Sequence, residues 1–157
     1  MKETIEQYWK DTDQQTGNLM MLRQRVLHYS IALSDNWLMS WIPANGRFAC
    51  DSGQFKIYPL GSDWEVAKWV HYLDKATIKD NLMKSVDIFH QKWNYFFFNW
   101  NCEHWARLVS TGDPICYQIP DCPVINVLGV WRRNHHASKQ LSDRGGQIGL
   151  TSQETLA

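Results

Sequence analysis

One segment of the sequence combines the start of a helix with a cysteine and a histidine: Asn99-Trp100-Asn101-Cys102-Glu103-His104-Trp105-Ala106. Asn101 suits the N-cap, because its side chain can accept hydrogen bonds from backbone N–H groups of the first turn. Further along, Gly112-Asp113-Pro114 supplies a stop. Between these points, three apolar residues share one helical face: Trp105, Leu108 and Val109. We therefore predict a helix from about Asn101 to about Ser110.

The position of Cys102 in the first turn of this helix suits a nucleophile. Exposed backbone N–H groups and the positive end of the helix dipole favour the thiolate over the thiol. The same N–H groups can hold the oxyanion of a tetrahedral intermediate. The alternative is that Cys102 is a small buried apolar residue, as most isolated cysteines are.

The remainder of the chain predicts a mixture of strands and helices. β-Branched and aromatic residues favour strands at 19–22, 26–33, 37–42 and 54–58, and more ambiguously at 64–72. Thr77-Ile78-Lys79-Asp80 resembles a capping box with Asp in place of Glu. Apolar residues then recur at helical spacing: Ile78, Leu82, Val86, Phe89 and Trp93. Near the N-terminus, Ile5 and Trp9 permit one or two turns of amphipathic helix.

Composition and charge exclude several classes of protein. The 157 residues fit one domain, and 16 basic residues balance 16 acidic ones, so no field of one sign attracts nucleic acid. No apolar run approaches the about 20 residues of a membrane span. Four cysteines without a close pair make a poor zinc site. Because residues 1–11 lack the pattern of a signal peptide, we expect free thiols and a cytoplasmic location.

We divide the chain into an N-terminal extension at 1–15, a domain at 16–122 and a C-terminal tail at 123–157. The tail ends in a stretch rich in Ser, Gln and Gly with almost no periodic apolar pattern, which predicts disorder from about residue 132. His135 and His136 lie at the start of that stretch, and a solvated tail explains them better than a metal site does.

The segment around Cys102, preceded by Tyr95, resembles the motif of the lecithin:retinol acyltransferase-like family: a tyrosine, a few apolar residues and Asn-Cys-Glu-His-Phe. Four consecutive residues match, from Asn101 to His104. Weaker similarities extend the resemblance over roughly residues 15 to 120: Gly17-Asn18-Leu19, Thr111-Gly112-Asp113 and Gln118-Ile119. The resemblance implies an α+β, permuted papain-like fold, in which a small antiparallel sheet packs against helices and the catalytic cysteine stands at a helix N-terminus.

In that permuted order the catalytic histidine lies on a strand upstream of the cysteine, and His28-Tyr29-Ser30-Ile31-Ala32-Leu33 resembles this strand. The resemblance thus makes His28 the base. A neutral imidazole near pH 7 could accept the thiol proton and later protonate the leaving group. Taken alone, a histidine within an apolar strand is more often a core residue with a satisfied hydrogen bond.

Many members of the family carry a second histidine one strand later, and the corresponding position here is Ser40. If Ser34-Asp35-Asn36 is a three-residue loop, Ser30 lies opposite Ser40, and Ser40 is diagonal to His28 on the same face. A two-residue loop would turn Ser40 to the opposite face. Because serine is short, a water bridge to His28 would be one way to make contact. The substitution would weaken the orientation of His28, alter substrate choice or mark a degenerate enzyme.

Four motif residues are expected to support the site: Tyr95, Asn101, Glu103 and His104. Tyr95 could position the loop before the helix, and Asn101 would cap the helix. Glu103 and His104 follow the cysteine on the helix, so their side chains point about 100° and about 200° away from it. Packing or structural support is therefore expected of these two residues, in preference to chemistry.

The resemblance implies acyl transfer or ester hydrolysis through an acyl-thioester on Cys102, with no metal or organic cofactor. The substrate would be a small-molecule acyl donor, with a phospholipid as one candidate, and any contact with a membrane would be transient. Several tryptophans suit a lipid-like acyl chain, although core packing explains them equally well: Trp37, Trp41, Trp100 and Trp105. Two alternatives stay open, namely an inactive interaction domain with this fold and a Cys-His amidase or peptidase.

Overall fold

A computed structural model describes residues 1–24, 27–45, 51–68, 70–92, 94–95, 101–113 and 115–117. Within these ranges the chain forms six strands and three helices. The strands are β1 (Leu19–Leu22), β2 (His28–Ala32), β3 (Trp37–Pro43), β4 (Asp51–Pro59), β5 (Trp64–Val66) and β6 (Asn94–Tyr95). The helices are α1 (Lys2–Tyr8), α2 (Lys75–Lys92) and α3 (Cys102–Thr111). The expected α+β class is confirmed.

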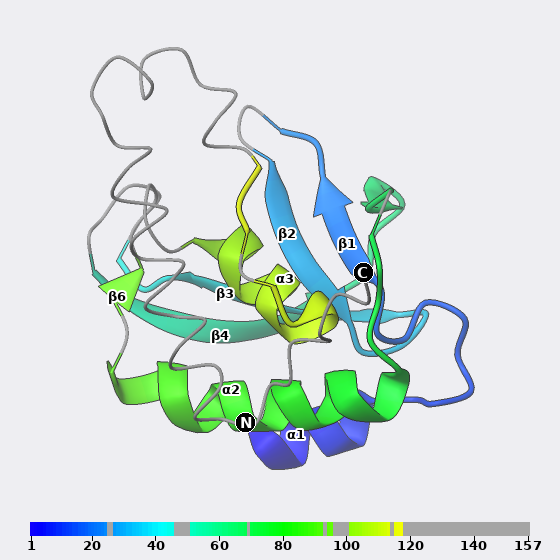
Figure 1. Cartoon of the computed structure of the whole chain (residues 1–157), viewed down its shortest axis with the longest axis horizontal. Coiled ribbons are helices and arrows are strands. Elements are labelled where there is room, and N and C mark those ends of the chain that lie inside the picture. The colour runs from blue at the N-terminus through cyan, green and yellow to red at the C-terminus, as the bar shows by residue number, and fades with distance from the viewer. Residues whose placement is uncertain are drawn as a thin grey trace, which may run out of the picture.

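The strands form one antiparallel sheet in the order β5-β1-β2-β3-β4-β6 (Figure 1). From β1 to β4, each strand pairs with the next strand in sequence, as short connections favour. β5 then returns to pair with β1, and the short β6 pairs with the far end of β4. The small antiparallel sheet predicted from the sequence is therefore present, with β6 as a strand that the sequence did not indicate.

Between β2 and β3 the chain turns over three residues, Ser34 to Asn36, which follow Leu33. The backbone N–H of Leu33 donates to the carbonyl of Trp37 at 2.8 Å and closes this loop. The pairing of Ile31 with Met39 and of Ala32 with Leu38 fixes the register. Ser30 and Ser40 consequently face each other on the same side of the sheet, which is the arrangement expected for a three-residue loop.

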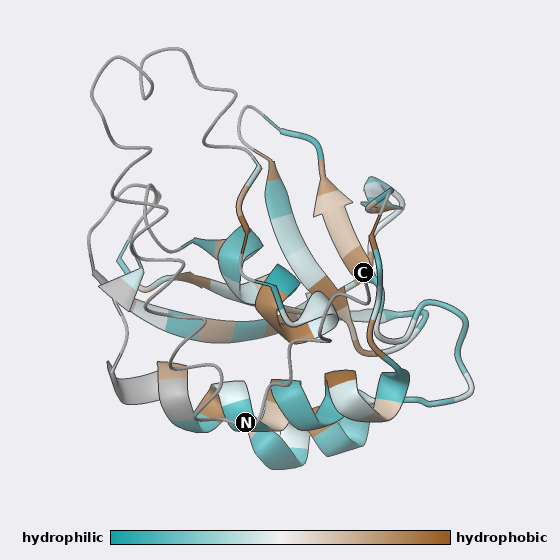
Figure 2. Cartoon of the chain, viewed as in Figure 1, coloured by the Kyte–Doolittle hydropathy of each residue, from teal (hydrophilic) through white to brown (hydrophobic). Residues whose placement is uncertain are grey.

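The two faces of the sheet meet different surroundings. On one face, strand residues join α2 and α3 in the main hydrophobic core, and they include Leu19, Tyr29, Ile31, Met39, Trp41 and Phe55. Side chains alternate along a strand, so His28, Ser30 and Ser40 belong to the other face. That face carries a smaller cluster: Met20, Ala32 and Leu38, with Tyr58, Leu60 and Trp64 packed against them. In Figure 2, brown and teal residues alternate along α2, as expected for a helix with one buried side.

The N-terminal helix contributes to the main core. Ile5 is 0% exposed and Trp9 is 4% exposed, and both belong to the cluster that α2 and α3 share with the sheet. Figure 1 shows α1 alongside α2, where Lys79 forms an ion pair with Glu6 at 2.6 Å. The one or two helical turns predicted near Ile5 and Trp9 are thus present. Ile5 and Trp9, which the sequence analysis placed in an N-terminal extension, therefore contribute to the main core.

Two boundaries differ from the sequence prediction. α2 begins at Lys75, because Asp74 precedes it as the cap: its carboxylate accepts from the Thr77 backbone N–H at 2.9 Å and from the Thr77 hydroxyl at 2.6 Å. Thr77 therefore lies in the first turn and does not cap the helix. Among the described residues of 64–72, only Trp64–Val66 form a strand. The predicted C-terminal tail lies outside the described residues.

We predict that Gly53→Ala destabilises the fold. A Cβ atom at Gly53 would lie 2.0 Å and 2.1 Å from ring atoms of Trp41, a fully buried side chain. Overpacking of this kind costs about 1–3 kcal/mol of unfolding free energy. Urea denaturation followed by tryptophan fluorescence measures the change. Gly61→Ala is the matched control, because its Cβ would meet only Trp64, at an ordinary 4.0 Å. Equal stability of the two variants would contradict the prediction.

Candidate active site

The start of α3 has the cap that the sequence predicts. The Asn101 side-chain oxygen accepts from the backbone N–H of Glu103 at 2.9 Å and of His104 at 3.3 Å. The backbone N–H of Asn101 donates to Nδ1 of His104 at 3.2 Å, which completes a capping box. At the other end, Gly112 adopts φ 78°, a left-handed conformation that favours glycine. The predicted helix, its cap and its stop are confirmed.

Cys102 is the first residue of α3 and is 4% exposed. Three groups hydrogen-bond its sulfur in a way that lowers the thiol pKa: the Tyr29 backbone, the Tyr95 side chain and the Glu103 backbone. Tyr29 directly follows His28 on β2. Since the β2–β3 pairing in the described strands covers Ile31 and Ala32, Tyr29 lies beyond the end of that ladder. The thiol thus meets β2 at the residue next to His28.

The protonation state of this thiol differs from the expectation for a helix start. Burial raises the pKa of Cys102 to about 11, and the charge of Glu103 adds to the increase. The hydrogen bonds from Tyr29 and Tyr95 oppose this effect without cancelling it. Loss of hydration therefore raises the thiol pKa by more than the helix N-terminus lowers it, because the sulfur is removed from water almost completely. Near pH 7 the resting group is a thiol.

A buried ion pair follows Cys102 on α3. Glu103 is 0% exposed, and one carboxylate oxygen accepts from Nε of Arg107 at 2.8 Å. The other oxygen accepts from the Cys116 thiol at 3.1 Å. The Arg107 guanidinium lies 5.6 Å from the ring centroid of Tyr29. These contacts connect the first two turns of α3 to β2.

His28 lies at the start of β2 on the face of the sheet away from the main core. Its Nε2 is 3.2 Å from the Ser40 hydroxyl and 3.2 Å from the Tyr58 hydroxyl. The ring also contacts Trp64, with the two centroids 5.7 Å apart. Burial lowers the pKa of His28 to about 4, so the imidazole is neutral near pH 7. Among the described residues, no hydrogen bond joins this ring to the Cys102 thiol.

Ser40 lies diagonal to His28 and touches it directly, so this contact needs no water bridge. Tyr58, on β4, was not foreseen as a site residue. Its strand pairs Tyr58 with Leu38, which brings the phenol hydroxyl beside Ser40 at 2.5 Å. The sequence carried a weak signal for this residue at most, because the register of β4 depends on the connection after Pro43 and not on a local motif.

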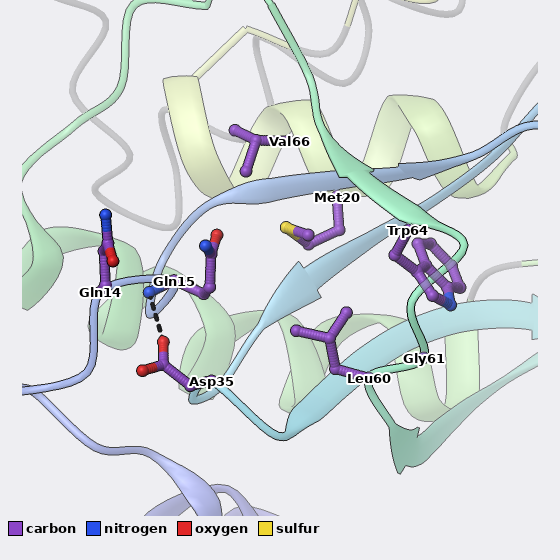
Figure 3. A pocket seen from close by; sticks show the side chains of 8 residues that line it. All are labelled: Gln14, Gln15, Met20, Asp35, Leu60, Gly61, Trp64 and Val66. Carbon is purple, nitrogen blue, oxygen red and sulfur yellow. Dashed lines mark hydrogen bonds between the residues drawn. The ribbon is translucent and has the colours of Figure 1, made fainter.

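Figure 3 shows a pocket of about 300 Å³ lined in part by Met20 and Trp64. These two residues belong to the face of the sheet that also carries His28. The pocket lining combines apolar and polar side chains: Met20, Leu60, Trp64 and Val66 with Gln14, Gln15, Asp35 and Gly61. Trp64 connects the two regions, because its ring lines the pocket and also contacts His28. A ligand in this pocket would therefore approach the imidazole along Trp64.

Of the four tryptophans that the sequence analysis related to an acyl chain, two lie in the core. Trp41 and Trp105 are both 0% exposed within the core. Trp37 is half-buried against Tyr8, with ring centroids 4.4 Å apart. Trp100 lies outside the described residues. Core packing thus accounts for Trp41 and Trp105, while Trp64 is the tryptophan next to His28.

The described ranges contain no sign of a metal site or a membrane span. There, no three His, Cys, Asp or Glu side chains come together in a way that could hold a metal ion. Cys102 and Cys116 are free thiols. In the same part of the chain, no helix has the length and apolar character to cross a bilayer. No family model, no curated protein and no solved structure matches the sequence or fold of this chain.

We predict that His28 contributes to acid sensitivity of the fold. Its pKa rises from about 4 in the folded protein to 6.5 in the unfolded chain, so the unfolded chain binds more protons between these values. Stability from this group is complete above pH 6.5 and is lost as the pH falls towards 4, by up to about 3 kcal/mol.

Urea denaturation at several pH values tests this prediction, with His28→Gln as the comparison. Stability of the variant should fall less steeply between pH 6.5 and 4. His104, with a pKa lowered to about 3 by burial, remains in both proteins and keeps part of the slope. Parallel curves for the two proteins would contradict the contribution of His28.

Proposed function

We propose that this chain is a cysteine acyltransferase or hydrolase that forms an acyl-thioester on Cys102, with His28 as the base. One observation carries the proposal: the thiol at the first turn of α3 contacts the β2 backbone at Tyr29, next to a neutral His28. A permuted papain-like arrangement, as the Asn-Cys-Glu-His motif suggests, would use these two groups in this chain order.

The reaction would proceed in two steps that return the enzyme to its starting state. The imidazole takes the Cys102 proton as the sulfur attacks the carbonyl carbon of an ester, thioester or amide. The bond from that carbon to the leaving group breaks, and the leaving group receives the proton from the imidazolium. Water, an amine or a hydroxyl then attacks the thioester, His28 takes its proton, and the released thiolate recovers that proton.

Backbone N–H groups near Cys102 would stabilise the negative oxygen of each tetrahedral intermediate. The cap uses the N–H groups of Glu103 and His104, because both donate to Asn101. It does not use the N–H of Cys102 itself, which stands at the positive end of α3. This N–H group hydrogen-bonds the Tyr95 hydroxyl in the resting site, so it would serve the oxyanion hole once substrate displaces that hydroxyl.

The resting site supports a slow enzyme whose thiol is activated only during attack. A pKa of about 11 for Cys102 and about 4 for His28 disfavours a thiolate–imidazolium pair before substrate binds. In substrate-free sites, catalytic hydrogen bonds are often long and shorten once substrate is bound. The same burial favours a second candidate, a non-catalytic interaction domain. Reactivity with acyl donors distinguishes the two functions.

The pocket beside Trp64 suggests where an acyl group would bind. Its apolar wall consists of Met20, Leu60, Trp64 and Val66, and it lies on the face that carries His28. A volume of about 300 Å³ is at the lower end for small-molecule sites. We therefore favour a small acyl donor, or one chain of a lipid, as the substrate.

We predict that incubation with an activated ester adds one acyl group to Cys102, located by mass spectrometry of the intact protein and its peptides. His28→Gln should slow this addition by about a hundredfold or more, as expected for loss of a general base. Cys102→Ser should remove the adduct from this position. Cys116→Ser is the control for the other described thiol, since serine can still donate to Glu103.

An ordinary alkylating reagent should behave differently. Iodoacetamide reacts mainly with the thiolate, and a thiol pKa of about 11 leaves little thiolate at pH 7, so its reaction with Cys102 should be slow there and increase above pH 8.5. An acyl adduct that forms equally fast in His28→Gln would mean that His28 is not the base. Absence of any adduct on well-folded protein would favour the non-catalytic domain.

We also predict that Val66→Trp narrows the range of acyl donors. Val66 is 37% exposed at the pocket, so a larger side chain can fill space there without disturbing the core. The ratio of kcat/KM for a long-chain ester to that for an acetyl ester should fall about tenfold, since each excluded methylene loses roughly 0.8 kcal/mol. Val66→Thr, of similar volume, is the control. An unchanged ratio would remove the pocket from the acyl-binding site.

A further inference from the structure

The contacts of His28 extend beyond Ser40 into a buried group of three hydroxyls. We call Ser30, Ser40 and Tyr58 the hydroxyl cluster. Both serines are 0% exposed. The Tyr58 hydroxyl is 2.8 Å from Ser30, 2.5 Å from Ser40 and 3.2 Å from Nε2 of His28. The two serine hydroxyls also hydrogen-bond each other. Tyr58 and Ser40 thus each contact the two other hydroxyls and the imidazole.

Three strands build this cluster, so its geometry does not depend on one loop. Ser30 comes from β2, Ser40 from β3 and Tyr58 from β4. The Tyr58 ring packs against Trp64, with the centroids 5.9 Å apart, which limits its rotation. Burial raises the pKa of Tyr58, so its hydroxyl keeps its proton. The phenol is a fixed, neutral hydrogen-bonding group beside the imidazole.

A count of protons favours one tautomer of His28. Each hydroxyl has one proton, and the three pairwise contacts within the cluster can use all three protons. Oxygen lone pairs of Ser40 and Tyr58 then remain to accept a hydrogen bond from Nε2–H. If Nε2 were the acceptor instead, one hydroxyl proton would leave the cluster and one internal hydrogen bond would be lost. Inside a protein this loss is costly.

We propose that Tyr58 is a positioning residue, which with Ser40 holds His28 in the Nε2–H tautomer and leaves Nδ1 as the nitrogen that accepts the Cys102 proton. The catalytic meaning of this assignment rests on the proposed acyl-transfer function. The orientation of the imidazole does not, because it follows from the hydroxyl cluster alone. Tyr58 would act through His28 and would not touch the substrate.

The cluster also explains how Ser40 can stand where many members of the resembling family have a second histidine. Ser40 reaches Nε2 with one short side chain, and Tyr58 provides a second oxygen at the same distance of 3.2 Å. Hydroxyls orient the ring but carry no charge, so they stabilise an imidazolium less than a carboxylate would. The lowered pKa of His28 agrees with such neutral partners. The partners of His28 therefore orient its ring without making it a strong base.

Tyr58→Phe tests the assignment, because it removes one hydroxyl and keeps the ring against Trp64. Nitrogen-15 NMR of the His28 ring, identified by comparison with His28→Gln, reports the tautomer. The wild-type protein should have its proton on Nε2. The variant should show an increased share of the Nδ1–H tautomer, and acylation of Cys102 should slow about fivefold to tenfold, the effect of one neutral hydrogen bond.

Two further variants complete the experiment. Tyr72→Phe also removes a partly buried tyrosine hydroxyl, one that contacts the Leu19 backbone and not His28, and it should change neither measurement. Ser30→Ala withdraws a partner of the Tyr58 hydroxyl without touching the imidazole. Ser30→Ala should shift the His28 tautomer in the same direction as Tyr58→Phe, by a smaller amount. If Tyr58→Phe does not fold, the tautomer in Ser30→Ala decides whether the hydroxyl cluster positions His28.

Each outcome bears on a separate proposal. A wild-type His28 with its proton on Nδ1 overturns the assignment of Tyr58, as do an unchanged tautomer and acylation rate in folded Tyr58→Phe. If wild-type Cys102 accepts no acyl group from any donor, the proposed function fails, and the nitrogen shifts alone then decide whether Tyr58 positions His28. A shifted tautomer with a slower acylation supports both proposals.

Discussion

The cap at Asn101 is the interaction on which the candidate site depends. It satisfies the first backbone N–H groups of α3 inside the protein, where water does not reach them. With the cap in place, the helix can begin in the core, and Glu103 and Arg107 can pair beside Tyr29. Cys102 is then held against the backbone of β2. Without a buried helix start, the thiol and His28 would have no fixed relation.

The same burial that positions the two groups also reduces their reactivity. Removing a thiol from water raises its pKa, and removing an imidazole from water lowers its pKa, so both become neutral. Under the proposed function, such a neutral pair would exchange a proton only when another charge develops nearby. Neutral hydroxyls around His28 agree with this condition, since they direct the ring without favouring its charged form.

Features that depend on neighbouring residues, such as helix ends and turns, could be predicted from the sequence better than features that depend on strand pairing or burial. The bounds of α3 could be predicted because Asn101 and Gly112 act on neighbouring residues. The sequence left two registers open for Ser40, and the three-residue turn corresponds to the one that places it beside His28. Asp74 was missed as a cap because Thr77 offered a similar pattern three residues later. Neither Tyr58 nor the protonation of Cys102 could be predicted, because the first depends on how β4 pairs with β3 and the second on how deeply α3 is buried.

The depth of Cys102 has a consequence for the lifetime of the protein. An accessible thiolate attacks peroxides and disulfides and is oxidised in the process, whereas a thiol with 4% exposure and a raised pKa reacts poorly with both. A more open, ionised cysteine would react faster with substrate and would also be oxidised sooner. Burial therefore protects this thiol from oxidation and reduces its reactivity at the same time.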